Sequence, residues 1–68
     1  MKTPEQIAEK LIPMEREWLT GWAGPPGAAY NVIGSYMARI GLTRSYTDWN
    51  LNERGLAVRD YILEQTND

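Results

Sequence analysis

The sequence predicts one small, mainly α-helical domain, residues 1–68, with a short β-hairpin near its C-terminal end. Apolar residues recur at helical spacing in several segments, proline and glycine separate those segments, and residues 42–51 alternate between apolar and polar types. A chain of 68 residues buries only about 60% of its unfolded surface, so a small core is expected. The absence of cysteine excludes disulfides as a supplement to that core.

Two short helices are predicted at the N-terminus. Thr3 and Gln6 have the spacing of a capping box, and Pro4 suits the first position of a helix. Pro13 ends or kinks this helix, because proline lacks a backbone donor, and a second helix can begin with Pro13 as its first residue. Its apolar face is expected to contain Met14, Trp18, Leu19 and Trp22.

The strongest helix signal lies in residues 28–41, after the loop-forming run Ala-Gly-Pro-Pro-Gly at 23–27. The spacing predicts an inward face made by Ala29, Ile33, Tyr36 or Met37, and Ile40. Gly41 is placed for a left-handed C-cap, and Gly34 permits a close packing contact. The opposite face carries Asn31, Ser35 and Arg39, four residues apart.

The segment 42–51 is predicted to form a hairpin with its turn at Thr47-Asp48, followed by a last helix that Asn52 caps. Within "ARIGLTRSYTDWNLNERGLAVRDYIL", residues 38–63, this order resembles the ending of winged-helix proteins, including MarR-like regulators. The matching features are Gly41-Leu42, the strand Thr43–Tyr46, Trp49-Asn50-Leu51, Asn52 and Gly55. The chain also looks like small open reading frames of phages and other mobile elements. The resemblance implies a winged-helix-like fold of three to four helices plus a two-stranded wing.

Charge is unevenly distributed along the chain, whose net charge is −2. Residues 1–20 and 48–68 carry all nine acids, whereas residues 21–47 contain Arg39 and Arg44 and no acid. DNA affinity comes mainly from neutralised phosphates, so two arginines make a thin basic footprint. A homodimer would double it.

The residue types present argue against an enzyme. The chain has no histidine, which is the commonest general base in enzymes, and no cysteine. Zinc sites built on these residues, and Ser-His or Cys-His nucleophile pairs, are therefore absent. The carboxylate pairs Glu5/Glu9 and Asp60/Glu64 fit solvated helix faces, and no phosphate-binding glycine loop is present. We therefore expect no cofactor and no metal. No apolar run suggests a membrane helix or a secretory signal, which favours a cytoplasmic protein.

The leading functional hypothesis is a non-catalytic DNA-binding regulator of phage or mobile-element type. The recognition-like helix 28–41 would read bases with Asn31, Ser35 and Arg39, and Arg44 and Tyr46 on the hairpin would contact the DNA backbone. The rival hypothesis is a module or inhibitor that binds a host or phage protein through an acidic and aromatic surface, with Trp22, Tyr30, Tyr36 and Asp48 as candidates. A subunit that folds only in an assembly is a third possibility.

The distribution of charge on the folded surface distinguishes the first two hypotheses. A DNA-binding protein should gather its cations on one face: Arg16, Arg39, Arg44 and Lys10. A protein-binding module should present an acidic or aromatic patch instead.

Overall fold

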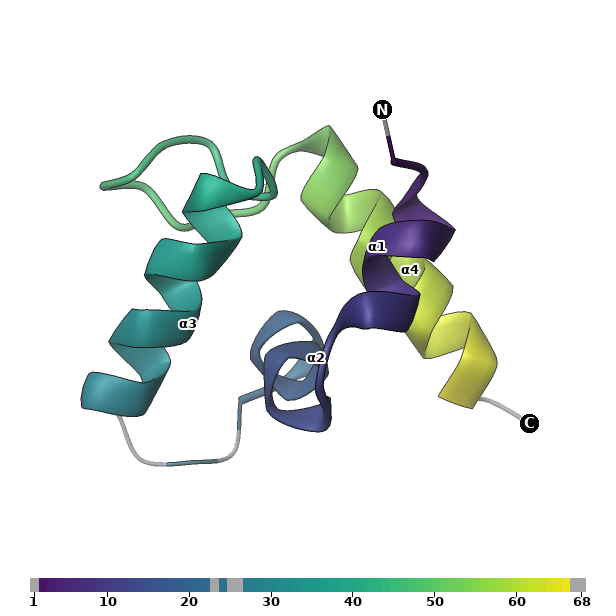
Figure 1. The fold of residues 1–68 in the computed structure, drawn as a ribbon, viewed down its shortest axis with the longest axis horizontal. Coiled ribbons are helices and arrows are strands. Elements are labelled where there is room, and N and C mark those ends of the chain that lie inside the picture. Colours follow the sequence, from purple (N-terminus) through teal and green to yellow (C-terminus); the bar gives the residue numbers. More distant parts are fainter. Residues whose placement is uncertain (1, 23, 25–26, 67–68) are drawn as a thin grey trace.

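Four helices form the part of the protein that the structure describes. A computed structural model describes residues 2–22, 24 and 27–66. The helices are α1 (Pro4–Lys10), α2 (Pro13–Thr20), α3 (Ala28–Arg39) and α4 (Glu53–Thr66). In Figure 1, α1 and α4 lie together on the right, α3 runs along the left, and α2 lies lower between them, in contact with both α3 and α4. Three residues of the predicted 23–27 loop, Ala23, Pro25 and Pro26, lie outside the described residues.

Local signals set the starts of the first two helices, as the sequence predicts. The Gln6 N–H donates to Thr3 Oγ1 at 3.2 Å, and the Thr3 N–H donates to Gln6 Oε1 at 3.0 Å, which completes the capping box. Pro13 is the first residue of α2. The helix ends at Thr20, before Gly21, whose φ of 154° suits glycine.

The end of α3 is a Schellman motif. Gly41 adopts a φ of 83°, its N–H donates to the Ala38 carbonyl at 3.1 Å, and the Leu42 N–H donates to the Met37 carbonyl at 3.0 Å. The motif reverses the chain so that Leu42 returns to the core, where it is completely buried. The predicted left-handed cap at Gly41 is confirmed.

The core lies where α1, α2 and α4 meet the inner face of α3. Met37, Leu42 and Val58 are its most deeply buried large side chains. The sequence left Tyr36 and Met37 as alternatives for the inward position. The structure buries Met37 completely and leaves Tyr36 40% exposed. Met14, predicted to face inward, is 47% exposed, because α2 is only two turns long and its start lies at the edge of the core.

Aromatic rings hold the segment after α3 against the helices. The Trp49 ring lies directly over Gly34, where an added Cβ would come within 2.6 Å of two indole carbons. Its ring centroid is 6.1 Å from that of Trp18 and 5.9 Å from that of Tyr30. The close contact predicted at Gly34 is therefore present, with Trp49 as the partner.

The predicted two-stranded wing is wrong, and with it the winged-helix-like fold class. Among the residues that the structure describes, 42–51 contain one isolated antiparallel bridge, between Thr43 and Leu51, and no strand. Side chains satisfy the backbone locally: Ser45 Oγ accepts from the N–H groups of Thr47 and Asp48, at 3.3 and 2.9 Å. Such bonds compete with a strand ladder.

The turn also differs from its predicted position at Thr47-Asp48. The Ser45 N–H donates to the Asp48 carbonyl at 3.2 Å, which places Tyr46 and Thr47 at the tip of the loop. Immediately after this turn, Trp49 packs inward onto α3, so the chain cannot continue as a regular strand. The segment is a loop that is closed by side chains and anchored by one aromatic ring.

Asn52 joins this loop to α4. Its Oδ1 accepts from the Gly55 N–H at 2.9 Å, and its Nδ2 donates to the carbonyls of Gly41 and Thr43 at 2.8 and 3.0 Å. The predicted N-cap is thus confirmed. The same side chain also fixes the end of α3 relative to the start of α4.

Candidate nucleic-acid interface

The outer face of α3 is the candidate site with the strongest support from the sequence. Asn31, Ser35 and Arg39 are all exposed, and their four-residue spacing places them along one side of the helix. Together with Val32 and Tyr36 they line a shallow hollow to which no carboxylate contributes. The structure therefore brings together the three predicted base-reading residues.

The opposite side of α3 holds this face in place. Ile33, Gly34 and Met37 are buried against the core, and Gly34 lies beneath the Trp49 ring. Because these contacts fix both the rotation and the position of the helix, the outer residues project from a rigid support. Such support is what a precise recognition surface needs.

The outer side chains have chemistry suited to base edges. An asparagine amide can bond adenine through its donor and acceptor, and an arginine guanidinium can bond guanine through two parallel donors. Val32 is 68% exposed between them and offers an apolar contact of the kind made with a thymine methyl group. Among the described residues that line the hollow, Arg39 alone carries a formal charge.

The two residues predicted to contact the DNA backbone, Arg44 and Tyr46, lie on the loop after α3 rather than on a strand. Both are exposed, and Tyr46 is 70% exposed at the tip. The Tyr46 carbonyl accepts the Trp49 indole N–H at 3.1 Å, and the Arg44 N–H donates to the Asn50 carbonyl at 3.0 Å. The backbone that carries these side chains is therefore held, although not by a sheet.

The residues of the rival protein interface are brought together only in part. Tyr30 and Trp22 are half-buried with ring centroids 5.8 Å apart, and Tyr30 also packs on Trp18. Asp48 is half-buried in its loop, where Oδ1 accepts from the backbone and the side-chain amide of Asn50, at 3.1 and 2.7 Å. Tyr36 is exposed, and it lies in the α3 hollow instead.

Of the four cations that a DNA-binding protein was expected to gather on one face, only some lie near the α3 hollow. Arg16 lies apart from α3, in a hollow with Pro13 and Glu17, and donates to the Ala8 carbonyl at 3.1 Å. Lys10 lines a cleft that shares Tyr36 with the α3 hollow.

That cleft contains two further cations, Lys2 and Arg54, which were not predicted from the sequence as site residues. Lys2 and Lys10 are about two helical turns apart, which is a weak signal that they lie on one side of α1. Nothing in the sequence connects Arg54 with either lysine.

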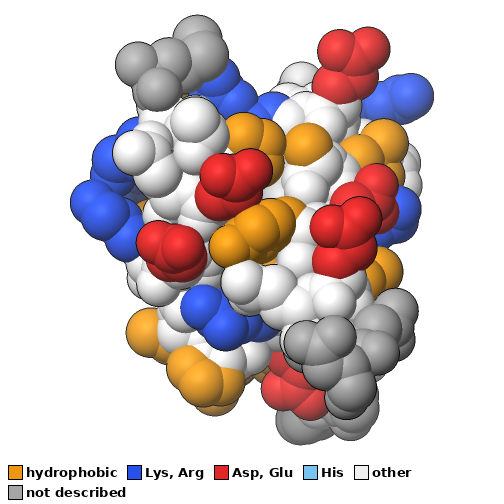
Figure 2. Space-filling view, turned by 90° about the vertical axis from the view of Figure 1, so that its right-hand side faces the viewer, with side chains coloured by type: hydrophobic (Ala, Val, Ile, Leu, Met, Phe, Trp, Pro, Cys, Tyr) orange, Lys and Arg blue, Asp and Glu red, His pale blue; other side chains and the backbone are white. Residues whose placement is uncertain are grey.

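The face built by α1 and α4 has a different character. Figure 2 shows acidic and basic side chains interspersed across it, with apolar patches between them. Exposed apolar residues of α4 include Leu56 and Leu63, at 38% and 39%. A polyanion would meet carboxylates there, whereas the α3 hollow presents none.

The described residues lack two other features, a cluster of metal ligands and a membrane-spanning helix. No group of three or more histidine, cysteine, aspartate or glutamate side chains is placed to hold a metal ion. No helix in this part of the chain has both the length and the apolar character needed to cross a membrane. Comparison with family models, with curated proteins and with solved structures gave no match, so nothing there bears on the resemblance to MarR-like regulators.

Proposed function

We propose that the protein is a non-catalytic module that binds duplex DNA through the outer face of α3. The observation that carries the proposal is the exposed row Asn31, Ser35 and Arg39, which lies in a hollow without a carboxylate and on a helix whose other face is fixed in the core. This arrangement supports insertion of α3 into the major groove, which is about 12 Å wide and admits one helix.

Contacts to the DNA backbone would come from the segment that follows α3. Arg44 and Tyr46 are exposed a few residues beyond the C-terminal end of the helix, on a loop that Trp49 anchors. Each neutralised phosphate contributes about −0.9 to the slope of log affinity against log salt. With few cations at the interface, we expect modest affinity at low salt, a shallow slope, and stronger binding by a dimer.

An amide NMR titration with mixed-sequence duplex DNA at low and then moderate salt tests this function. We expect chemical-shift changes concentrated at Asn31, Ser35, Arg39, Arg44 and Tyr46, and weaker binding as salt rises. Arg39→Gln should weaken binding by about 1–3 kcal/mol if the guanidinium reads a base, and Asn31→Ala should act in the same direction. A folded protein whose α3 signals stay unchanged at low salt would refute the proposal.

Arg59→Gln is the matched control for Arg39→Gln. It removes the same charge from α4, where Arg59 already pairs with Asp60 at 3.2 Å. Equal losses from the two substitutions would mean that DNA responds to net charge rather than to the α3 face, and would contradict the proposed site.

A second candidate function, binding of a protein partner by the same face, is favoured by Val32 and Tyr36. These residues are 68% and 40% exposed side by side in the hollow, and apolar and aromatic contacts dominate protein interfaces. Val32→Ser separates the two functions by the size of the loss. A protein interface should lose most of its affinity, whereas DNA binding should weaken only slightly, by the loss of one apolar contact with a thymine methyl group. The readout is binding of each isolated partner to the wild type and the variant.

A further inference from the structure

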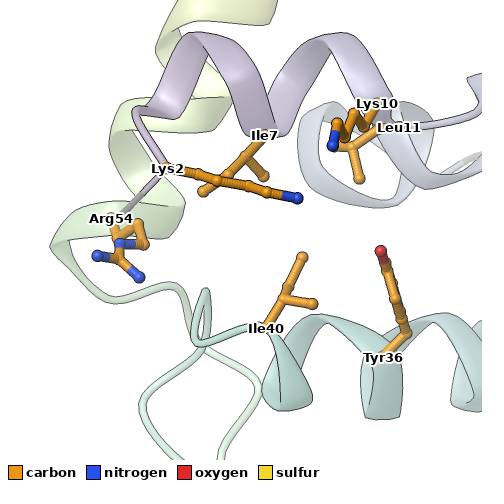
Figure 3. Close-up of a pocket in the computed structure, with 7 residues that line it drawn as sticks. All are labelled: Lys2, Ile7, Lys10, Leu11, Tyr36, Ile40 and Arg54. Carbon is orange, nitrogen blue, oxygen red and sulfur yellow. The ribbon is translucent and has the colours of Figure 1, made fainter.

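A second concave site lies beside the α3 hollow. It is a cleft of about 210 Å³ between α1, the C-terminal end of α3 and the start of α4. Its lining residues are Lys2, Ile7, Lys10, Leu11, Tyr36, Ile40 and Arg54. Figure 3 shows the ammonium ends of both lysines and the hydroxyl end of Tyr36 directed into the same end of the cleft, with the apolar side chains around them.

The charges in this cleft are of one sign. Three of its seven lining residues are cationic and none is acidic. Among the described residues, neither Lys2 nor Lys10 forms an ion pair. Glu9 lines a separate surface hollow together with the same two lysines, and it does not line the cleft.

The two lysines affect each other's protonation. The interaction of the Lys2 side chain with that of Lys10, together with the repulsion between the two charges, lowers the pKa of Lys2 below its ordinary value. Like charges in contact disfavour the doubly protonated state, and an anion between them would reverse that effect. The free protein thus holds two cations close together with no described counter-charge inside the cleft.

We propose that this cleft is an oxyanion site that binds one phosphate group, with the ammonium groups of Lys2 and Lys10 and the hydroxyl of Tyr36 as its donors. The site stands independently of the proposed DNA binding. Ammonium groups and hydroxyls are donors suited to phosphate oxygens, and the apolar walls contributed by Ile7, Leu11 and Ile40 reduce competition from water. The cleft is smaller than the roughly 300–1,000 Å³ of typical small-molecule sites, which fits a single phosphate group.

The primary test is a titration with inorganic phosphate at constant ionic strength, followed by NMR. We expect saturable shift changes at Lys2, Lys10 and Tyr36. Lys2→Gln and Lys10→Gln should each weaken binding up to about fivefold, as for a partly exposed ion pair, and the double variant should abolish saturation. Glu9→Gln should tighten binding, because it removes the competing carboxylate.

The controls separate a built site from general attraction. Arg59→Gln removes a cation elsewhere and should leave phosphate binding unchanged. Chloride at the same ionic strength should not reproduce the shifts. Shifts that rise without saturation, that spread equally to Arg44 and Arg59, or that survive the double lysine variant would overturn the proposal. Both lysines are exposed, so the variants should keep the fold, which circular dichroism verifies.

The phosphate could belong to a DNA backbone or to a free phosphorylated small molecule, and a duplex titration distinguishes the two. Shifts at both lysines, together with weaker DNA binding by Lys10→Gln, would assign the site to a backbone phosphate. Saturable binding of inorganic phosphate with no response of the lysines to DNA would assign it to a small molecule. If Arg39→Gln loses DNA binding but still binds inorganic phosphate, the α3 face and the cleft are separate sites, and each proposal can be refuted without the other.

Discussion

Replacing Gly34 by alanine tests how α3 is held, since the proposed DNA-binding face depends on that support. An added Cβ would lie 2.6 Å from Cε3 and Cζ3 of Trp49, and 2.8 Å from Cδ2. Ordinary carbon contacts are about 3.5–4.0 Å, so the ring or the helix must move by about 1 Å. The ring cannot move easily, because Trp18 and Tyr30 pack against it and its indole N–H is bonded to the Tyr46 carbonyl.

Two opposing effects set the size of the change in stability at Gly34. Overpacking of a fitted core costs about 1–3 kcal/mol. Alanine regains about 1 kcal/mol over glycine in a helix interior. Because the ring is held on several sides, we expect the upper part of the steric range and a net loss of about 1–2 kcal/mol in the free energy of unfolding. For a domain of this size each kcal/mol lowers Tm by about 4–8 °C.

Thermal unfolding followed by near-ultraviolet circular dichroism measures both Tm and the packing of the tryptophan. Ser35→Ala is the matched control, because it changes the neighbouring exposed position of the same helix and should be neutral or slightly stabilising. In a protein that already carries Trp49→Leu, Gly34→Ala should lower the free energy of unfolding much less, because the indole ring that the new Cβ meets is absent. A Gly34→Ala protein with a raised Tm and an unchanged aromatic spectrum would refute the contact and the argument for a rigid α3.

Three further predictions concern the junction before α4 and the cleft. Asn52→Ala should lower the free energy of unfolding in urea by about 2–3 kcal/mol, because it removes an N-cap and leaves two backbone carbonyls without their donor, whereas Asn52→Ser, whose hydroxyl keeps an uncharged cap acceptor, should lose less. Gly55→Ala should be more damaging than any of these, since its Cβ would collide with the Leu42 carbonyl oxygen, and we expect a loss of cooperative unfolding. Lys2→Gln should leave Tm at neutral pH unchanged or slightly raised. The lowered pKa of Lys2 means that protonation beside Lys10 opposes folding, an effect that disappears as pH rises through that pKa. A clear fall in Tm would contradict the repulsion between the lysines.

The sequence predicts the helix boundaries well wherever a local rule determines them. Thr3 with Gln6, Pro13, Gly41 and Asn52 act through hydrogen bonds or steric limits that involve residues only a few positions away. The row Asn31, Ser35 and Arg39 is predictable for the same reason, because helical spacing alone places the three on one side.

The prediction of a hairpin is wrong because the alternation of apolar and polar residues is compatible with two different structures. Alternating apolar residues at 42–51 fit a strand pair, and they equally fit a loop whose apolar side chains, Leu42 and Trp49, return separately to the core. Ser45 and Asp48 decide the outcome by accepting nearby backbone N–H groups. The resemblance to a wing therefore came from residue types that a side-chain-closed loop also needs.

The cleft could not be predicted from the sequence because its lining residues come from three separate elements. Lys2 precedes α1 and Lys10 is its last residue, Tyr36 lies on α3, and Arg54 lies on α4. The helices α1 and α4 pack together, whereas α3 approaches them across the cleft. The count of charges along the chain gives a mildly acidic protein, yet folding separates the two signs locally. The acids of α1 and α4 share a mixed surface with bases, while the α3 hollow and the neighbouring cleft are lined without any carboxylate. Net charge is thus a poor guide to the ligand here, because an anion experiences the local field of the surface that it meets.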